Sequence, residues 1–440
     1  MAGLLGMAMF AVYNANGREI ATYDSQPTKY AARELLLRGT LSLNYVVGSA
    51  PGLAERSAFV VARDGRFRSA YSPVPAILAA TVTWPLWKTG ALDIRAPRAP
   101  ALMAALTASL LVSLAGSLVF LAARRTLSMS RALAVATGFG LGTGLWPTAS
   151  QTLWQHETAI VGLALAVYGL ISLHLGAFGR YRGAAFVGIG LGLAGASRLQ
   201  LAPAVIVLLI GLAVSSGWRT ALLSTILTAT IVVPVLVANH LWFGTVLGAG
   251  PVLEALHEKV HASSGSFSLS AEGFAGLLIS PSRGLLIFSP VVLVTLAGLR
   301  GMFKEGWRSP AAWCLLAALS EFLLYGSYVV WWGGHTYGPR YMLDILPLLV
   351  PAAIMAMTTL RGRLAGSLAS LALAWSVATA ALGAFTYPHE RWNSTPADVD
   401  RHHERLWDWS DNQIARAWRA GPSAQNFTLF TRESVRVPRP

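Results

Sequence analysis

Long apolar segments separated by polar ones run along the sequence from the N-terminus to about residue 385. Apolar runs reach roughly 16 to 23 residues, the length a helix needs to cross a hydrocarbon core of about 30 Å. The pattern predicts an all-α integral membrane protein with about 11 transmembrane helices. We expect the spans at residues 1–12, 101–123, 132–144, 158–175, 184–196, 199–215, 221–238, 285–299, 311–330, 342–359 and 364–385.

Basic residues follow every second expected span. Cytoplasmic loops carry an excess of lysine and arginine, so this spacing predicts an N-terminus inside and a C-terminus outside. The apolar segment 73–87 is interrupted by three prolines, and a crossing there would move the next basic loop to the outer side. We therefore expect a juxtamembrane or re-entrant helix. The expected inner residues are Arg124, Arg125, Arg131, Arg180, Arg182, Arg219, Arg300, Lys304, Arg308, Arg361 and Arg363.

The spans predict a transmembrane domain over residues 1–385, with residues 14–100 as a long first outer loop containing juxtamembrane helices. Residues 386–440 form a polar outer tail or small cap, and its tryptophans are of a type that favours the membrane interface. Residues 1–12 lack a basic n-region and an Ala-x-Ala cleavage site, so they do not predict a signal peptide. The segment is short for a span, so either the crossing continues through 13–15 or the protein begins upstream.

Composition agrees with this class. Of 440 residues, 54% are hydrophobic and 12% charged, about half the charged fraction of a soluble protein. The net charge of +14 indicates positive inner loops and an affinity for anionic lipid head groups; we expect no nucleic acid partner. Cys314 is the single cysteine, so an intramolecular disulfide is excluded.

A stretch from Trp331 to Tyr341 combines aromatics, a histidine and an arginine between two apolar runs. Arginines at outer ends of spans are not explained by the positive-inside rule, and a guanidinium binds phosphate with paired donors. We therefore expect a lipid-phosphate site. Alternatively, Arg340 pairs with Asp344 one turn later, the tyrosines belong to an aromatic belt, and His335 is an interface histidine. The phosphate-binding candidates are Arg198, Arg283, His335, Tyr337, Arg340 and Tyr341.

Acidic side chains near the expected outer surface supply the second part of the candidate site. Asp24 is either a general base near the membrane or a turn residue ahead of Pro27. His156 and Glu157 begin a span, where they either line a polar chamber that binds sugar hydroxyls or a divalent metal, or cap the helix. Glu321 lies inside a span and is either paired or functional.

One motif points to different chemistry. His257, Glu258 and His261 match the H-E-x-x-H pattern, in which two histidines bind zinc and the glutamate activates water. Apart from Glu272 no third ligand is evident. A zinc metalloprotease is thus a less favoured alternative.

Taken together, ordered motifs resemble the GT-C superfamily of polytopic glycosyltransferases, including bacterial protein O-mannosyltransferases and aminoarabinose transferases. The motifs are Asp24 with Pro27 and Lys29; Arg63-Asp-Gly-Arg66 with Tyr71-Ser-Pro73-Val-Pro75; Trp146-Pro147 through Trp154-Gln-His156-Glu157; Ser280-Pro-Ser-Arg283-Gly284 with Phe288-Ser-Pro290; and Trp331-Trp-Gly-Gly-His335 through Gly338-Pro-Arg340-Tyr341.

The resemblance implies a transferase of the bacterial inner membrane whose active site faces the periplasm or cell exterior. It implies a polyprenyl-phosphate sugar donor, a glycan, lipid or protein acceptor, Asp24 as base and Glu157 as an acceptor or metal position. Tyr23 and Ser25 flank Asp24, where many relatives have a second acid. The alternative from another class is a transporter or flippase of lipid-linked sugars, which predicts charges within several spans and inverted internal symmetry.

Overall fold

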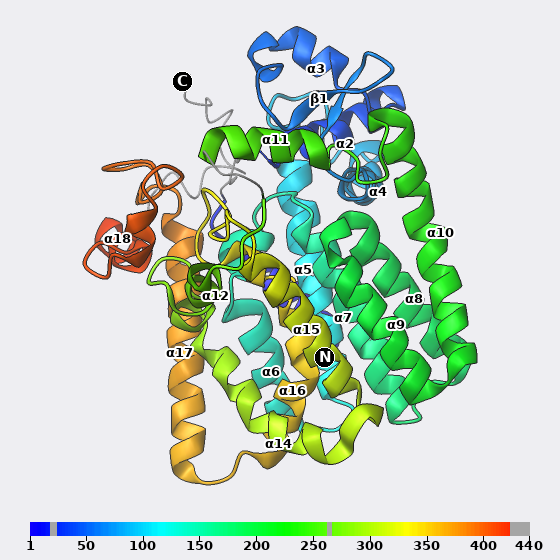
Figure 1. The fold of residues 1–440 in the computed structure, drawn as a ribbon, viewed down its shortest axis with the longest axis vertical. Helices are drawn as coiled ribbons and strands as arrows, with labels where there is room; N and C mark the ends of the chain where they lie inside the picture. Colours follow the sequence, from blue (N-terminus) through cyan, green and yellow to red (C-terminus); the bar gives the residue numbers. More distant parts are fainter. Residues whose placement is uncertain (18–23, 262–265, 423–440) are drawn as a thin grey trace.

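The computed structural model describes residues 1–17, 24–261 and 266–422 as a bundle of long helices with a smaller layer of helices and a hairpin across one end (Figure 1). The helices are α1 (Ala2–Asn14), α2 (Gln26–Arg38), α3 (Asn44–Ser49), α4 (Val74–Lys88), α5 (Ala99–Ala123), α6 (Met129–Leu141), α7 (His156–His174), α8 (Arg180–Ser197), α9 (Ala202–Ser216), α10 (Trp218–Phe243), α11 (Gly250–His261), α12 (Ala271–Ile279), α13 (Leu285–Phe288), α14 (Leu296–Glu305), α15 (Pro310–Gly326), α16 (Leu346–Thr359), α17 (Arg363–Thr386) and α18 (Gln413–Ala420). Strands β1 (Phe59–Val61) and β2 (Phe67–Ser69) pair antiparallel.

Five helices of the described chain are long and apolar enough to cross a membrane, and a sixth crossing is counted if a bent pair forms one span. The bend of 104° separates residues 290–308 from Pro310–Gly326. The membrane character is therefore confirmed, whereas the number of about 11 spans is not. Two expected spans are apolar helices of 10–17 residues, Ala2–Asn14 and Leu346–Thr359.

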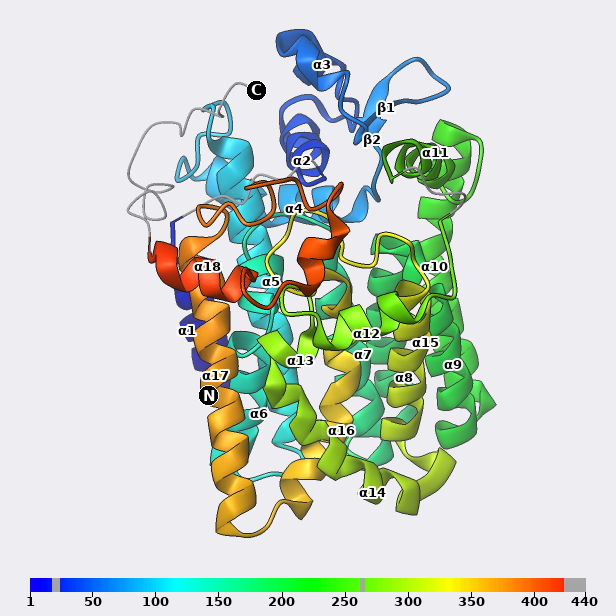
Figure 2. The ribbon, with the colours of Figure 1, turned by 60° about the vertical axis from the view of Figure 1, so that its left-hand side comes forward.

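The loops expected on the inner side lie at one end of the bundle. The α5–α6, α7–α8, α9–α10 and α16–α17 connections and α14 are at the lower end in Figures 1 and 2. Helices α2, α4 and α18 and the hairpin are at the opposite end. The arginines of the expected inner loops and the residues of the first loop are thus separated by the length of the bundle.

Close helix packing in the bundle depends on small side chains, as is usual where apolar burial alone does not favour helix association in lipid. At the α7–α8 contact, a Cβ at Gly162 would lie 2.6 Å from the carbonyl oxygen of Gly190, and a Cβ at Gly190 would lie 2.5 Å from that of Gly162. The two backbones touch because neither residue has a side chain. Helix α8 ends at Ser197, and Arg198 is its C-terminal cap residue.

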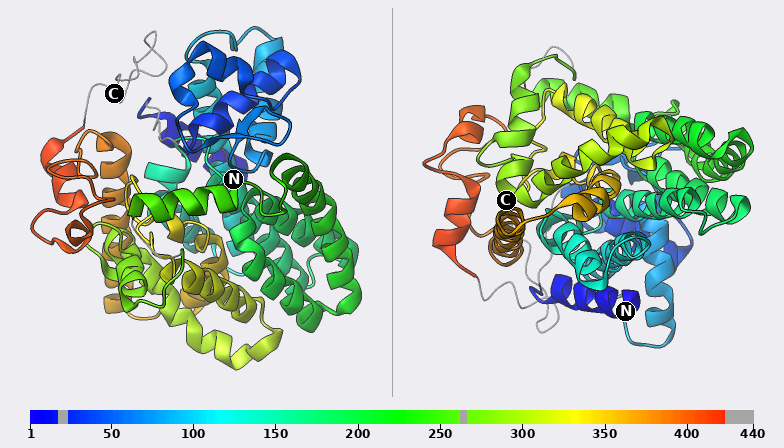
Figure 3. Two further views of the ribbon diagram at one scale, coloured as in Figure 1. Left: turned by 45° about the horizontal axis from the view of Figure 1, so that its top comes forward. Right: turned by 90° about the horizontal axis from the view of Figure 1, so that it is seen from below.

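The first loop and the C-terminal segment form the layer at the other end. Helix α2 has proline in its first turn, which suits a helix start, and ends at Gly39. Buried side chains of α2, α3, β1, α4 and α5 make a separate apolar cluster around Phe59 and Met103. The cap segment, residues 387–422, lies beside α17 (Figure 3).

Gly383 on α17 provides a test of this packing. A Cβ there would lie 2.2 Å from Tyr337 Cε1, so Gly383→Ala must displace a buried ring. We expect a loss of about 1–3 kcal/mol in the free energy of unfolding, measured by equilibrium unfolding in micelles. Gly366→Ala is the control because no atom lies within 4 Å of its Cβ on the same helix. Equal stability of the two variants would contradict the observed packing.

Candidate active site at the end of the bundle

The stretch from Trp331 to Tyr341 connects α15 to α16 at the end where the first loop lies. Gly333, Gly334 and Gly338 have φ near +70° (+73°, +70° and +70°), a left-handed conformation that glycine adopts without steric cost. These turns fold the stretch back on itself, and a short 3-10 helix, Arg340–Met342, follows them. Arg340 is thereby directed toward the first loop.

Asp24 and Arg340, 316 residues apart, form an ion pair. Both terminal nitrogens of Arg340 lie 3.0 Å from Asp24 Oδ2. The guanidinium also lies 3.9 Å from the ring centroid of Trp154, a cation–π arrangement that fixes its plane. The structure thus brings the predicted base and one predicted phosphate ligand into direct contact.

The ion pair continues into a buried set of charged groups. Asp344 Oδ1 lies 3.0 Å from His156 Nδ1, and Asp344 Oδ2 lies 2.9 Å from Arg198 Nε. Arg198 and Arg340 approach His156 Nε2 at 3.1 and 3.3 Å. Arginine only donates, so Nε2 must be the acceptor and the ring proton is on Nδ1, directed at Asp344. We call Asp24, Arg340, His156, Asp344 and Arg198 the ion-pair network.

Side-chain exposure in the ion-pair network is greatest at Asp24. The side chains of His156 and Asp344 are 0% exposed, Arg198 is 6%, Arg340 13% and Asp24 39%. Solvent, and any substrate entering from it, therefore reaches the network at Asp24. The buried members are suited to hold Arg340 in place, because paired charges in a low-dielectric site are rigid and strongly coupled.

Several members of this site were not predicted as site residues from the sequence. Tyr71 hydrogen-bonds to Asp24, and burial, with the negative charge of Asp24, raises the pKa of its phenol well above the usual value. Tyr325 accepts from Arg198 and stacks on Tyr341 with centroids 4.5 Å apart. Of these two tyrosines, Tyr71 carried a signal, as part of a motif within the first loop, whereas Tyr325 carried none.

The pairing of Arg340 with Asp344 considered from the sequence is not what the structure shows. Arg340 instead pairs with Asp24, and Asp344 is bound by His156 and Arg198. The physical reason is the 3-10 geometry of Arg340–Met342, which does not align residues four apart as an α-helix does. Local spacing was therefore a poor guide to the partner.

The surroundings of His156 and Glu157 do not favour a metal ion. His156 Nε2 faces two guanidinium groups, an environment that repels a cation. Glu157 is fully buried and its Oε2 accepts from the backbone N–H of Trp154 at 3.2 Å. Glu157 lies in the first turn of α7, and its bond is to a residue that precedes the helix. Glu321 is buried in α15, close to the backbone N–H of Ala204 in α9.

Arg283 and Tyr337 have structural roles. Arg283 is fully buried and donates to the carbonyl oxygens of Trp332, Ser282 and Gly334 and to the side chains of Gln413 and Asn393. These bonds use the whole guanidinium. Tyr337 donates to the carbonyl of Thr379 at 3.0 Å. Neither side chain has a donor left for phosphate, so both are excluded from the ligand set that we propose.

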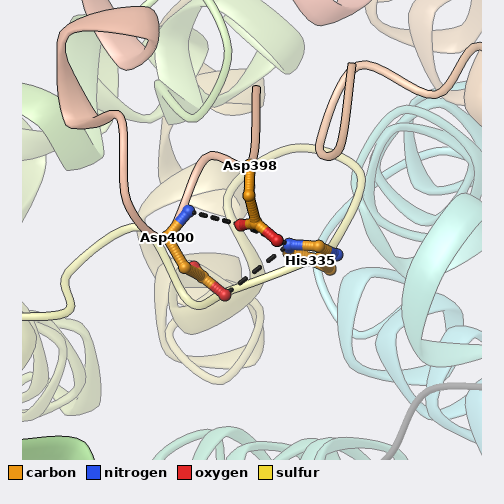
Figure 4. Close-up of side chains that lie close together, drawn as sticks. All are labelled: His335, Asp398 and Asp400. Atoms are coloured by element: carbon orange, nitrogen blue, oxygen red, sulfur yellow. Dashed lines mark hydrogen bonds and ion pairs between the residues drawn. The ribbon is translucent and has the colours of Figure 1, made fainter. Parts of the chain in front are cut away.

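His335 lies beside Asp398 and Asp400 of the cap segment (Figure 4). These three form the one group of three or more metal-ligating side chains found in the described parts of the chain. The H-E-x-x-H motif falls on α11, but the side chains of His257, Glu258 and His261 lie outside the described residues.

Comparison with known proteins finds similar structures but no matching sequence. The sequence matches no protein-family profile and no curated protein. The crystal structure of ArnT from Cupriavidus metallidurans bound to undecaprenyl phosphate is 14% identical, with a TM-score of 0.50 over 97% of this chain and 76% of that one. The apo structure of the same enzyme is 15% identical, with a TM-score of 0.53 over 83% of this chain and 60% of that one. The chain therefore has the fold of ArnT, a GT-C aminoarabinose transferase, as the resemblance of its motifs predicted.

Proposed function

We propose that this protein is a GT-C glycosyltransferase that moves a sugar from a polyprenyl-phosphate donor to an acceptor at the outer face of the bacterial inner membrane. The observation that carries the proposal is the contact of Asp24 with Arg340 at the exposed end of the ion-pair network. It unites a carboxylate that can act as base with a cation that can bind a leaving phosphate. The ArnT fold, with undecaprenyl phosphate bound in one structure, supports the donor class.

The roles follow from the chemistry of the transfer. The acceptor hydroxyl gives its proton to Asp24 as its oxygen bonds to the anomeric carbon, and the bond from that carbon to the phosphate oxygen breaks. Arg340, supported by Arg198, stabilises the negative charge that develops on the leaving phosphate. His156 and Asp344 are positioning residues, since they contact the guanidinium groups and are fully buried.

The outer orientation is supported by the distribution of arginine. The inner loops expected from the sequence lie at the end of the bundle opposite α2 and α18 (Figure 2), and positive loops stay in the cytoplasm. The ion-pair network, formed at the α2 end, would then face the periplasm. A lipid-linked sugar donor suits a site that faces the periplasm, because the donor lies in the outer leaflet and needs no nucleotide there.

A donor-binding and transfer assay tests the proposal. Purified protein in lipid receives a panel of radiolabelled undecaprenyl-phosphate sugars with glycan, lipid and peptide acceptors, scored for label leaving the lipid. Arg340→Gln is expected to raise the KM for the donor by about 10- to 100-fold, because a charge-assisted hydrogen bond to phosphate is lost. Arg66→Gln is the control, as Arg66 is a more exposed first-loop arginine, 57%, near Asp64.

Two results would contradict the proposed transferase function. One is an unchanged donor KM in Arg340→Gln when transfer by the unaltered protein is measurable. The other is movement of labelled lipid across vesicle membranes with no label transferred to any acceptor, which would support the transporter alternative instead.

A further inference from the structure

A compact His-Asp-Asp group joins the cap segment to the aromatic stretch. His335 Nε2 lies 3.1 Å from Asp398 Oδ1 and 3.6 Å from Asp400 Oδ2, and the three atoms all lie within 4.8 Å of one another. Figure 4 shows both carboxylates at the same end of the imidazole, beside Nε2. His335 comes from one segment and the two aspartates from another, with 63 residues from His335 to Asp398.

The separations of His335 from the two aspartates match those of ligands around one ion. Zinc bonds to histidine nitrogen and carboxylate oxygen are about 2.0–2.2 Å long. Two such ligands at angles between octahedral and tetrahedral values are about 2.8–3.6 Å apart. Both measured His335–Asp separations fall in this interval.

Surrounding contacts orient the candidate ligands. Trp332 donates its indole N–H to Asp400 Oδ1 at 2.7 Å, which leaves Oδ2 on the side of His335. The backbone N–H of Asp400 donates to Asp398 Oδ1 at 2.9 Å. Outer contacts of this kind are common around metal ligands, where they hold a carboxylate in one orientation. They also link the group to the stretch that presents Arg340.

A divalent ion can contact all three groups together, which a single ring proton cannot. One ring nitrogen donates one hydrogen bond, so it serves one carboxylate at a time. A divalent ion can bind the neutral imidazole and both carboxylates at once. The side chains of His335, Asp398 and Asp400 are 41%, 46% and 28% exposed, so solvent can complete the coordination sphere.

We propose that His335, Asp398 and Asp400 bind one divalent transition-metal ion of the zinc class. Imidazole and carboxylate together suit zinc better than magnesium or calcium, which prefer oxygen alone. The ion fastens the cap segment to the loop that carries Arg340, five residues after His335. The site goes beyond the proposed sugar transfer and does not depend on it.

Metal binding by the purified full chain tests the proposal. The protein is treated with chelator and then titrated with Zn²⁺ by calorimetry, with Co²⁺ absorption in the visible range as a second readout. We expect one Zn²⁺ per chain and a Zn²⁺-dependent rise in Tm. His335→Gln and Asp398→Asn are each expected to weaken Zn²⁺ binding at least about tenfold, since each removes a ligand. Mg²⁺ and Ca²⁺ should bind more weakly than Zn²⁺.

A histidine of the same cap segment provides the matched control. His402 Nδ1 lies 3.1 Å from Glu404 Oε1, and both side chains are exposed, 50% and 74%. His402→Gln therefore removes an exposed His–carboxylate pair but none of the three ligands, and it should leave Zn²⁺ affinity unchanged. The metal-free Tm of every variant is measured as well, so that a folding defect is separated from a loss of ligand.

The proposal would be overturned by Zn²⁺ binding that is equal in the unaltered protein and in His335→Gln. An equal loss of affinity in His402→Gln, or tighter binding of Mg²⁺ or Ca²⁺ than of Zn²⁺, would overturn it too. If Asp398→Asn does not fold, Asp400→Asn replaces it, since an asparagine there retains an acceptor for the Trp332 indole. Sugar transfer is not part of this readout, so the site and the proposed function fail independently.

Discussion

Asp24→Asn is expected to lower kcat for sugar transfer by about 10²- to 10⁴-fold, the range that general-base catalysis contributes. Asparagine retains the size of the side chain and can still accept a hydrogen bond, but it cannot take a proton from the acceptor. Asp24 is the most exposed member of the ion-pair network, 39%, so an acceptor can reach it from solvent. Initial rates with saturating labelled donor and varied acceptor measure the effect.

Asp64→Asn is the matched control for this experiment. Asp64 is also in the first loop, is 40% exposed and pairs with Arg68 at 2.7 Å. Its ion-pair partner is Arg68 of the same loop, whereas the partner of Asp24 is Arg340. We expect its transfer rate to remain within a factor of about two, as is usual for a surface ion pair. Transfer that survives in Asp24→Asn would assign the base to another residue while leaving the enzyme class in place.

Arg198→Met is expected to have the largest effect on stability, a loss of about 3–5 kcal/mol in the free energy of unfolding. Arg198 is nearly buried and lies 2.9 Å from Asp344 and 3.1 Å from His156. Its removal leaves the fully buried carboxylate of Asp344 without its cation, which is far more costly than removing both charges together. Equilibrium unfolding in mixed micelles measures the change.

Two further variants make this prediction specific. Adding Asp344→Leu to Arg198→Met removes the orphaned charge, and we expect the double variant to regain part of the lost stability but not the transfer activity. Arg219→Met, at an exposed position of α10 on the opposite end of the bundle, should change the stability by less than about 0.5 kcal/mol. Equal stabilities for Arg198→Met and Arg219→Met would show that the buried pair is unimportant.

The fold class was predictable because lipid leaves few alternatives. Most of the apolar runs and the proline-interrupted segment 73–87 have counterparts among the helices, whereas the expected span 285–299 is divided between α13, a 3-10 segment and α14. Helix α4, Val74–Lys88, lies with α2 at the end of the bundle in Figures 1 and 2. The number of spans was less predictable, because short helices and a 104° bend interrupt the apolar runs, and hydropathy alone does not report where a helix bends.

The candidate site likewise contains residues that the sequence identified and partners that it did not. Asp24, His156, Arg198 and Arg340 were identified from residue type and position, since charges at the ends of spans need a partner or a function. Arg283 met the same criterion, yet its guanidinium is used by Gln413 and Asn393, 130 and 110 residues away. A sequence shows that a buried charge requires partners but does not show which distant residues supply them.

The sequence by itself determined that this chain is a helical membrane protein, which end of each span carries the positive charge, and which polar residues are unusual for their surroundings. These properties follow from the composition of single segments and from the cost of placing charge in lipid. Only the tertiary structure decided that Arg340 pairs with Asp24, 316 residues away, and that Asp344 pairs with Arg198. Such pairings depend on how separate loops meet, and the 3-10 turn at Arg340 directs that side chain away from its neighbour in the sequence.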